Sequence, residues 1–250
     1  GSNFSRLRGR KEPLSGGGIS SGVLSFLRVN DRSASSIKSG GTTRRAAKMV
    51  ILDADHPDIS EYIDWKVTEE HKVAAMVTGS RILHRHAERL AAAAHAGDHD
   101  PELRRAIADA LRDEVPPVYV HRIIQLARQG VTDLPVREYS TEWDDEAYNT
   151  VSGQSSNNSV RVTNAFMQAV LDDGEWELVW RTDSSHKEKV KARALWEKIA
   201  VSAWQCADPG LQYHTTFNEW HTCPVDGEIR GTNPCVTGDT LIATDQGLRR

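Results

Sequence analysis

Short apolar strands alternate with amphipathic helices through the second half of the chain. Trp176, Leu178 and Trp180 alternate with polar residues, which is typical of a strand. The full pattern predicts three strands and two helices, in the order strand 159–162, helix 164–172, strand 176–181, helix 187–205 and strand 211–217. Strands that alternate with helices favour an α/β fold with a largely parallel sheet.

The first half of the chain contains similar elements and a longer helical stretch. Val23, Phe26 and Leu27 lie at helical spacing, and buried strands are predicted at 46–52 and 73–78. Asp55 is the expected N-cap of the helix that follows the first of these strands. Residues 81–130 are expected to be helical in two or three pieces, with Pro101 at the start of one piece and Pro116-Pro117 as a break.

The composition is that of an ordinary folded protein. Apolar residues make up 38% and charged residues 26% of the 250 residues, which argues against disorder. The net charge of -4 gives no basic field for a nucleic acid, and no apolar run reaches the length of a membrane span. Cys206, Cys223 and Cys235 form no Cys-x-x-Cys motif, so neither a disulfide scaffold nor a metal site is expected. These features predict a cytoplasmic protein.

Two loops rich in glycine and basic residues precede the first strand. The first contains Ser15, Gly16, Gly17 and Gly18, and the second contains Ser39, Gly40, Gly41, Thr42, Thr43, Arg44 and Arg45. Successive glycines let backbone N–H groups approach an anion, and an arginine offers a planar fork to a phosphate or a base. The residues alone leave open the alternative that both loops are flexible and solvated.

Seven stretches carry a resemblance to a known family: Gly1–Ser5, Leu14–Gly18, Ser39–Met49, Asp55–Ile59, Lys72–Gly79, Asn157–Val162 and Asp208–Cys235. In this order they resemble the ribonucleotide reductases, and most closely the long adenosylcobalamin-dependent (class II) members. The resemblance implies that the chain is part of a ten-stranded α/β barrel, in which a finger loop carries a cysteine to the centre. It also implies an enzyme that reduces ribonucleotides to deoxyribonucleotides.

The same resemblance assigns roles near the end of the chain. Cys235 occupies the position of the cysteine whose thiyl radical abstracts the ribose 3′-hydrogen, and Asn233 that of the residue which hydrogen-bonds the ribose hydroxyl. Adenosylcobalamin would generate the radical. The family expects a glutamate two residues after the cysteine, but Thr237 stands there. The reducing thiol pair is also missing, since neither Cys206 nor Cys223 lies at its place.

The resemblance gives the two Gly-rich loops a role and implies partners. Loops at these places in the family read an allosteric deoxynucleoside triphosphate and relay it to the substrate base. The implied partners are a ribonucleotide substrate, a thioredoxin-type reductant and a second copy of the chain in a homodimer. No membrane or nucleic-acid partner is expected.

The departure at Thr237 is explained if a second kind of protein begins at Cys235. Residues 235–247 resemble the opening block of a self-splicing domain of the Hedgehog/intein type, with a nucleophilic cysteine, a Gly-Asp-Thr turn and a β-hairpin. In that chemistry the Cys235 thiol attacks the Pro234 carbonyl and forms a thioester. We therefore expect residues 1–234 to be a reductase barrel segment and residues 235–250 to be the start of an intein.

Two other functions remain open from the sequence. The chain is alternatively a non-catalytic nucleotide-binding and dimerisation module, a reading that the loops at 14–22 and 39–48 favour. It is alternatively an autoprocessing element, in which the splicing chemistry of Cys235 is what matters. In each case the 250 residues alone are expected to be inactive as a reductase.

Overall fold

The computed structural model describes residues 1–37, 48–95, 97, 99–142 and 144–232, together with the backbone of 242–244 and 247–249. The chain divides into two compact units, one formed by residues 1–67 with 153–250 and the other by residues 68–152. Among the described residues, none of the helices is both long and apolar enough to span a membrane.

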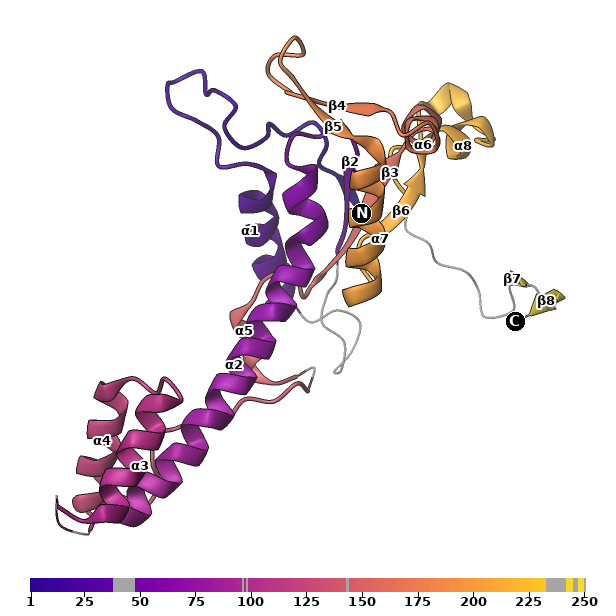
Figure 1. Ribbon diagram of the computed structural model, residues 1–250. Coiled ribbons are helices and arrows are strands. Elements are labelled where there is room, and N and C mark those ends of the chain that lie inside the picture. Colours follow the sequence, from indigo (N-terminus) through magenta and orange to yellow (C-terminus); the bar gives the residue numbers. More distant parts are fainter. Residues whose placement is uncertain are drawn as a thin grey trace. The chain divides into compact units, whose positions relative to one another are not determined.

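The first unit is built on a four-stranded parallel sheet (Figure 1). Its strands lie in the order β1 (Ser2–Asn3), β2 (Lys48–Asp53), β3 (Ser156–Val162) and β6 (Gly210–Tyr213). Ile51 is paired with Asn3 on one side and with Ser159 on the other, and Arg161 is paired with Asp53 and Gln212. The prediction of an α/β fold with a parallel sheet is therefore confirmed.

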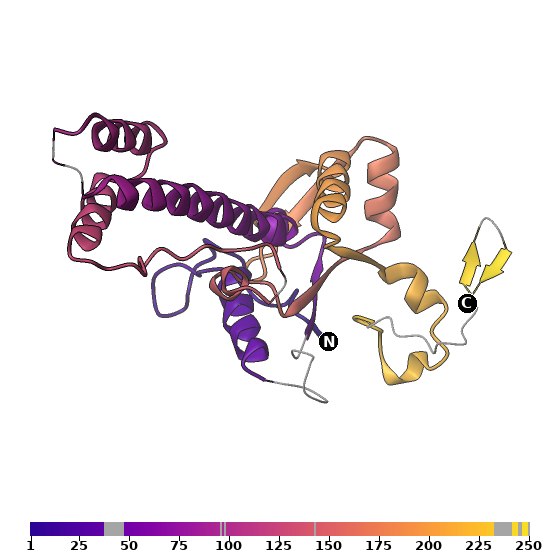
Figure 2. The same ribbon diagram turned by 90° about the horizontal axis from the view of Figure 1, so that it is seen from below.

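Helices cover one face of this sheet. The strand residues Val50, Leu52, Val160 and Val162 are fully buried in one cluster with apolar residues of the helices. These helices are α1 (Val23–Ser35), the first part of α2 (Ile59–Ala93), α6 (Asn164–Leu171) and α7 (Ala192–Cys206). Helices α6 and α7 lie side by side (Figures 1 and 2). Because side chains alternate along a strand, the neighbouring strand residues face the opposite side of the sheet, away from these helices, and we call this side the open face.

The turn between β2 and α2 organises the N-terminal loop. The Asp58 carboxylate accepts hydrogen bonds from the backbone N–H groups of Arg10 (2.7 Å) and of Val23 (2.8 Å), the first residue of α1. Gly22 has a φ of 85°, and a Cβ there would lie 2.7 Å from Asp58 Oδ2, so this close approach requires glycine. His56 is buried, and burial lowers its pKa, consistent with an Nε2–H that donates to the Leu7 carbonyl.

The prediction that Asp55 is an N-cap is wrong. Helix α2 begins at Ile59, and the Tyr62 N–H donates to the Asp58 carbonyl, so the helix starts from Asp58. The Asp55 carboxylate instead pairs with Arg181 at 2.6 Å. The turn through His56 and Pro57 shifts the helix start by several residues.

A strand at 73–78 is also a wrong prediction, because α2 is continuous through these residues. Val73 and Val77 lie one helical turn apart and pack with Ala147 and Val151, close to the short helix α5 (Glu146–Thr150). Their β-branched side chains suggested a strand, but burial on one helical face decides the conformation.

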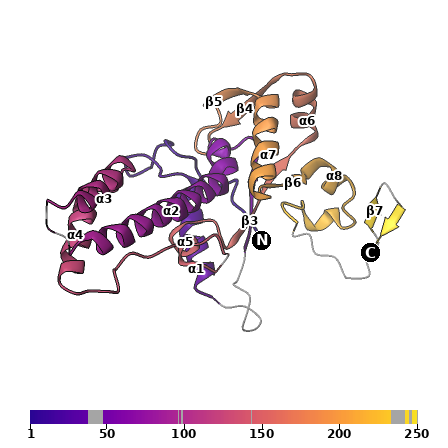
Figure 3. The same ribbon diagram turned by 60° about the horizontal axis from the view of Figure 1, so that its bottom comes forward.

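The second unit is helical, as predicted (Figure 3). Helices α3 (Pro101–Arg112) and α4 (Pro117–Arg128) pack with the C-terminal part of α2 around buried alanine, leucine, isoleucine and valine side chains. The Asp100 carboxylate caps α3 by accepting from Glu102 N at 2.8 Å and Leu103 N at 3.3 Å. Prolines begin both helices, at Pro101 and Pro117.

Residues 187–191 are a strand, although a helix was expected from 187. Strands β4 (Glu175–Val179) and β5 (Lys187–Lys191) form an antiparallel hairpin. Lys187 pairs with Glu177 at 2.6 Å and Lys189 with Glu175 at 2.8 Å. These cross-strand ion pairs and the contact with β4 are not visible in the local sequence, which reads as the first turn of the helix α7.

The last predicted strand is shorter than expected, since β6 ends at Tyr213 and α8 (His214–Glu219) follows directly. Beyond the short 3-10 helix η1 (Pro224–Asp226), β7 (Ile242–Thr244) and β8 (Gly247–Arg249) pair as a two-stranded antiparallel sheet. The structure shows four parallel strands, whereas the ten-stranded barrel was inferred from the family resemblance. Closure of the barrel therefore stays a prediction.

Candidate functional site at the open face of the sheet

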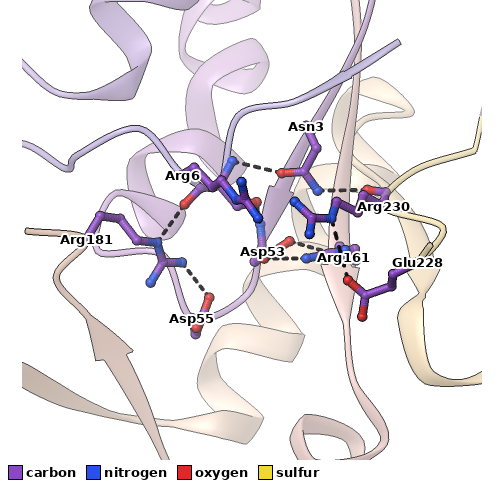
Figure 4. Close-up of a pocket in the computed structure, with 9 residues that line it drawn as sticks. Asn3, Arg6, Asp53, Asp55, Arg161, Arg181, Glu228 and Arg230 are labelled. Atoms are coloured by element: carbon purple, nitrogen blue, oxygen red, sulfur yellow. Dashed lines mark hydrogen bonds and ion pairs between the residues drawn. The ribbon is translucent and has the colours of Figure 1, made fainter. Parts of the chain in front are cut away.

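The open face of the parallel sheet is polar where the strands end. Asp53 ends β2, Arg161 lies one residue before the end of β3, and Asn3 ends β1. Ligands of parallel α/β sheets bind beyond the carboxyl ends of the strands. A cavity of about 300 Å³ lies there and is lined by Asn3, Ser5, Arg6, Asp53, Asp55, Arg161, Arg181, Glu228 and Arg230 (Figure 4).

Asp53 and Arg161 form a two-point ion pair between neighbouring strands. Arg161 Nε lies 2.5 Å from Asp53 Oδ1, and Arg161 Nη2 lies 2.7 Å from Asp53 Oδ2. Both side chains are largely buried. Burial alone would raise the pKa of Asp53, but the hydrogen bonds and the charge of Arg161 outweigh it and hold that pKa below its usual value. The pair is thus a fixed, ionised part of the cavity wall.

His214 extends this pair to the segment after α8. Arg161 Nη1 lies 3.3 Å from His214 Nδ1, and Asn218 Nδ2 lies 3.1 Å from the same atom. Both neighbours are donors, so Nδ1 is the acceptor and the ring proton lies on Nε2. His214 Nε2 is 2.9 Å from Glu228 Oε1, and therefore donates to that carboxylate.

Arg181 forms the other side of the cavity (Figure 4). Its guanidinium donates to Asp55 Oδ1 at 2.6 Å, to the Ser5 carbonyl at 2.6 Å and to the Val179 carbonyl at 2.8 Å. Its backbone N–H donates to Glu12, a fully buried carboxylate that also accepts from Gly9 and Thr182. Burial raises the pKa of Glu12, but these hydrogen bonds outweigh burial and lower the pKa overall.

The charges around the cavity leave a positive excess. Four arginines, Arg6, Arg161, Arg181 and Arg230, line it together with three carboxylates. Arg6 is exposed and has no ion-pair partner among the residues that the structure describes. A second cavity of about 180 Å³ shares Asp53, Asp55 and Arg161 and adds Thr163, Trp176 and His214. The arrangement suits a polar ligand with an anionic group.

Most of the site residues predicted from the sequence lie outside the residues that the structure describes. Ser39, Gly40, Gly41, Thr42, Thr43, Arg44, Arg45, Asn233, Pro234 and Cys235 are outside the described residues. Asn233 follows directly on Thr232, the last described residue of the segment that begins at Glu228. The roles assigned to them stay predictions.

The loop with Ser15, Gly16, Gly17 and Gly18 is an exposed turn. Leu14 N donates to the Gly18 carbonyl at 3.1 Å, and Gly17 N donates to the Leu14 carbonyl at 3.0 Å. Gly17 and Gly18 have φ values of 89° and 88°, so the turn itself requires glycine. The Gly17 N–H is therefore used within the loop, and a phosphate or effector role for the loop remains a prediction.

Asp53, Arg161, His214 and Glu228 were not predicted from the sequence as site residues. One signal was present, because the charged Arg161 lies between the buried Val160 and Val162 at the end of β3. A charged side chain within a strand indicates an open face with a partner across it. The Cys206 Sγ lies 3.4 Å from the Ser202 carbonyl oxygen and 3.3 Å from the Asp208 carbonyl oxygen, so its single S–H has two acceptors within reach at the end of α7. No cluster of metal-binding side chains occurs within the described part of the chain.

Comparison with known proteins decides the family. Residues 1–237 match the family model described as "Ribonucleotide reductase, barrel domain". The chain belongs to this family. It is 56% identical over 245 residues to the vitamin B12-dependent ribonucleotide reductase of Agrobacterium fabrum, covering 94% of this chain and 19% of the relative.

More distant relatives have similar names. A vitamin B12-dependent ribonucleotide reductase of Streptomyces coelicolor is 42% identical over 235 residues, covering 94% of this chain and 18% of the relative. A vitamin B12-dependent ribonucleoside-diphosphate reductase of Thermoplasma acidophilum is 26% identical over 236 residues, covering 94% of this chain and 20% of the relative. The chain therefore spans about a fifth of the length of these relatives.

Proposed function

We propose that this chain is part of the ten-stranded barrel of an enzyme that reduces ribonucleotides to deoxyribonucleotides. The observation that carries the proposal is the family match over residues 1–237, which includes the whole open face of the sheet and the segment that leads to Asn233. The names of the relatives support a vitamin B12-dependent reductase. One of them is named a ribonucleoside-diphosphate reductase, which supports a diphosphate substrate.

In this proposal the ribonucleotide lies against the polar face. Asn233 hydrogen-bonds a ribose hydroxyl, and a cysteine after Pro234 abstracts the 3′-hydrogen as a thiyl radical, so that the 2′-hydroxyl leaves as water. A thiol pair outside these 250 residues supplies two electrons and two protons and becomes a disulfide, and the cysteine then returns its hydrogen to C3′ and is again a thiyl radical. The fixed Asp53–Arg161 pair supports this site by keeping the cavity wall ordered and ionised. The thiols must stay reduced, which fits a cytoplasmic enzyme with a thioredoxin-type reductant.

Cobalamin enters the proposal through the names of the relatives. The two cavities at the site measure about 300 and 180 Å³, which suits part of a nucleotide and is far too small for a corrin ring with its side chains. The residues that line these two cavities therefore do not fit adenosylcobalamin by themselves. We assign them no contact with it.

Allosteric control by a deoxynucleoside triphosphate is the role proposed for the two Gly-rich loops, in a homodimer. The exposed position of Ser15–Gly18 supports a loop that is accessible to a ligand. Calorimetry with each deoxynucleoside triphosphate tests it on the natural full-length protein. Heat of binding that disappears in an Arg44→Ala/Arg45→Ala variant supports the role, and no heat with any of the four would contradict it.

We also propose that an intein begins at Cys235. The family match ends at residue 237, two residues after this cysteine, and β7 pairs with β8 in the antiparallel way expected after the first block. Splicing would remove Cys235 and bring the enzyme's own cysteine to the position after Pro234. A Cys-x-Glu sequence there would replace the Cys-Val-Thr of residues 235–237.

Reduction of ribonucleotides by the purified protein tests the main proposal. The spliced full-length protein, supplied with adenosylcobalamin and a dithiol, is expected to convert a ribonucleoside diphosphate to its 2′-deoxy product. The 250 residues alone are expected to give no product, since they lack the thiol pair and the restored cysteine. An inactive spliced protein would contradict the proposal, and so would turnover by residues 1–250.

A further inference from the structure

The segment Glu228–Thr232 crosses the open face of the sheet without pairing to it as a strand. It lines two cavities on that face, one through Glu228 and Arg230 and one of about 360 Å³ through Arg230, Gly231 and Thr232. Three side-chain carboxamides bind its backbone instead of a neighbouring strand.

Gln212 on β6 binds the last residue of this segment at two points. Its Oε1 accepts a hydrogen bond from Thr232 N at 2.9 Å, and its Nε2 donates to the Thr232 carbonyl at 2.9 Å. Gln212 is only 3% exposed, so water competes little for these hydrogen bonds. Together they reproduce the pair of hydrogen bonds that a neighbouring strand would make.

Asn218 on α8 makes the same kind of contact three residues earlier. Its Oδ1 accepts from Ile229 N at 2.8 Å, and its Nδ2 donates to the Ile229 carbonyl at 3.1 Å. Between these two points, Asn3 Nδ2 donates to the Arg230 carbonyl at 2.7 Å. Only a carboxamide offers a donor and an acceptor in one plane at this spacing, so a carboxylate at either position loses half of the contact.

Gly231 brings the segment close to the sheet between the two contacts. A Cβ added to Gly231 would lie 2.0 Å from Ile51 Cδ1, so a larger residue would require the buried Ile51 side chain or the segment itself to shift. Four successive residues, 229 to 232, are thus each fixed by a different contact. The next residue in the sequence is Asn233, followed by Pro234 and Cys235.

We propose that Gln212 and Asn218 are positioning residues, which fix the backbone of residues 229–232 and so set where the chain delivers Asn233 and the cysteine that follows Pro234. This proposal rests on the proposed function, since it assigns the two carboxamides a part in ribonucleotide reduction. Reacting groups must be held within a fraction of an ångström, and a misplacement of about 1 Å costs roughly 100-fold in rate. Neither side chain is assigned a contact with the substrate.

Amide hydrogen exchange on the 250-residue chain tests the contacts directly. In Gln212→Met, which keeps the approximate shape but removes the acceptor, the Thr232 amide is expected to exchange roughly tenfold faster while the Ile229 amide keeps its rate; Asn218→Leu is expected to do the reverse. Gln125→Met on the exposed face of α4 also removes a carboxamide and is expected to alter neither amide. Because Gln212 is buried and Asn218 only half-buried, the second variant keeps the test valid if the first misfolds.

Kinetics of the spliced full-length enzyme test the positioning role. Gln212→Met and Asn218→Leu are expected to lower kcat by roughly 10- to 100-fold, with KM for the ribonucleotide close to that of the wild type. Unchanged exchange at Ile229 and Thr232 would overturn the contacts, and faster exchange with unchanged kcat would overturn the positioning role. A wild-type enzyme without activity would overturn the proposed function and this role with it, while the exchange rates would still report on the contacts.

Discussion

At the scale of the residue, Arg161 and Asp53 are the pair on which the order of the open face depends. Replacing Arg161 by Lys keeps the charge but loses the planar fork, so one oxygen of a largely buried carboxylate loses its donor. Arg161→Lys is expected to lower the free energy of unfolding by about 2 kcal/mol, measured by denaturant titration. Arg193→Lys, at an exposed pair with Asp173, is the control and is expected to cost less than about 0.5 kcal/mol. Equal losses for the two variants would contradict the argument.

The buried Glu12 carboxylate makes the free energy of unfolding depend on pH. Its folded-state pKa lies below the usual 4.5, so its contribution is present at neutral pH and is lost as the pH falls through the folded-state pKa. Glu12→Gln is expected to lower the free energy of unfolding by about 2 kcal/mol at pH 7, because the amide NH2 meets donors rather than acceptors. The difference from the wild type should shrink below about pH 4. A constant difference between pH 7 and pH 3.5 would show that ionisation of Glu12 is not its source.

The residues that line the cavity were harder to predict from the sequence than the residues of the reductase motif. Asn233 and Cys235 are recognisable because they lie in a short motif that the family shares. Asp53, Arg161 and His214 come from three separate elements, and no local pattern links residues that lie 108 and 53 positions apart. Only the parallel register of β2, β3 and β6 places them together. Gln212 and Asn218 were missed for the same reason.

At the scale of the element, a substitution at Gly79 can test whether α2 is one continuous helix. It lies in the interior of α2, with no neighbouring atom within 4 Å of an added Cβ and without a positive φ. Gly79→Ala is therefore expected to raise the free energy of unfolding by about 1 kcal/mol. Gly17→Ala, in a turn with a φ of 89°, is the contrasting variant and is expected to lower it by about 1 kcal/mol. A destabilising Gly79→Ala would indicate that a turn, as after a strand at 73–78, interrupts the helix.

The elements show where local sequence decides structure. Helices α3 and α4 were predictable because prolines and a capping aspartate mark their starts. Val73–Thr78 and residues 187–191 were mispredicted because tertiary contacts override a weak local preference: one-sided burial makes the first stretch helical, and pairing with β4 makes the second a strand. The parallel sheet was predictable as a class, while its strand order followed only from the structure.

At the scale of the whole molecule, segments far apart in the sequence share one sheet. The family resemblance of Gly1–Ser5, Asn157–Val162 and Asp208–Cys235 put these stretches in order along the chain, and the structure brings their strands β1, β3 and β6 into one parallel array with β2. All of the described polar site belongs to the unit of residues 1–67 and 153–250. Of the described residues that line the cavity, none belongs to the helical unit of residues 68–152.

The family match ends at residue 237, close to the proposed start of an intein at Cys235. If an intein begins at Cys235, a chain translated to the natural end of its reading frame undergoes attack of the Cys235 thiol on the Pro234 carbonyl, and an added thiol then cleaves the resulting thioester. Mass spectrometry is expected to find an N-terminal fragment that ends at Pro234 after incubation with thiol, and a ligated product without Cys235 when no thiol is added. Cys235→Ala removes the nucleophile and should leave the precursor intact under both conditions. If Cys235 is instead the reductase's own cysteine, the wild-type chain also stays intact, and the Cys235→Ala variant loses ribonucleotide reduction rather than splicing.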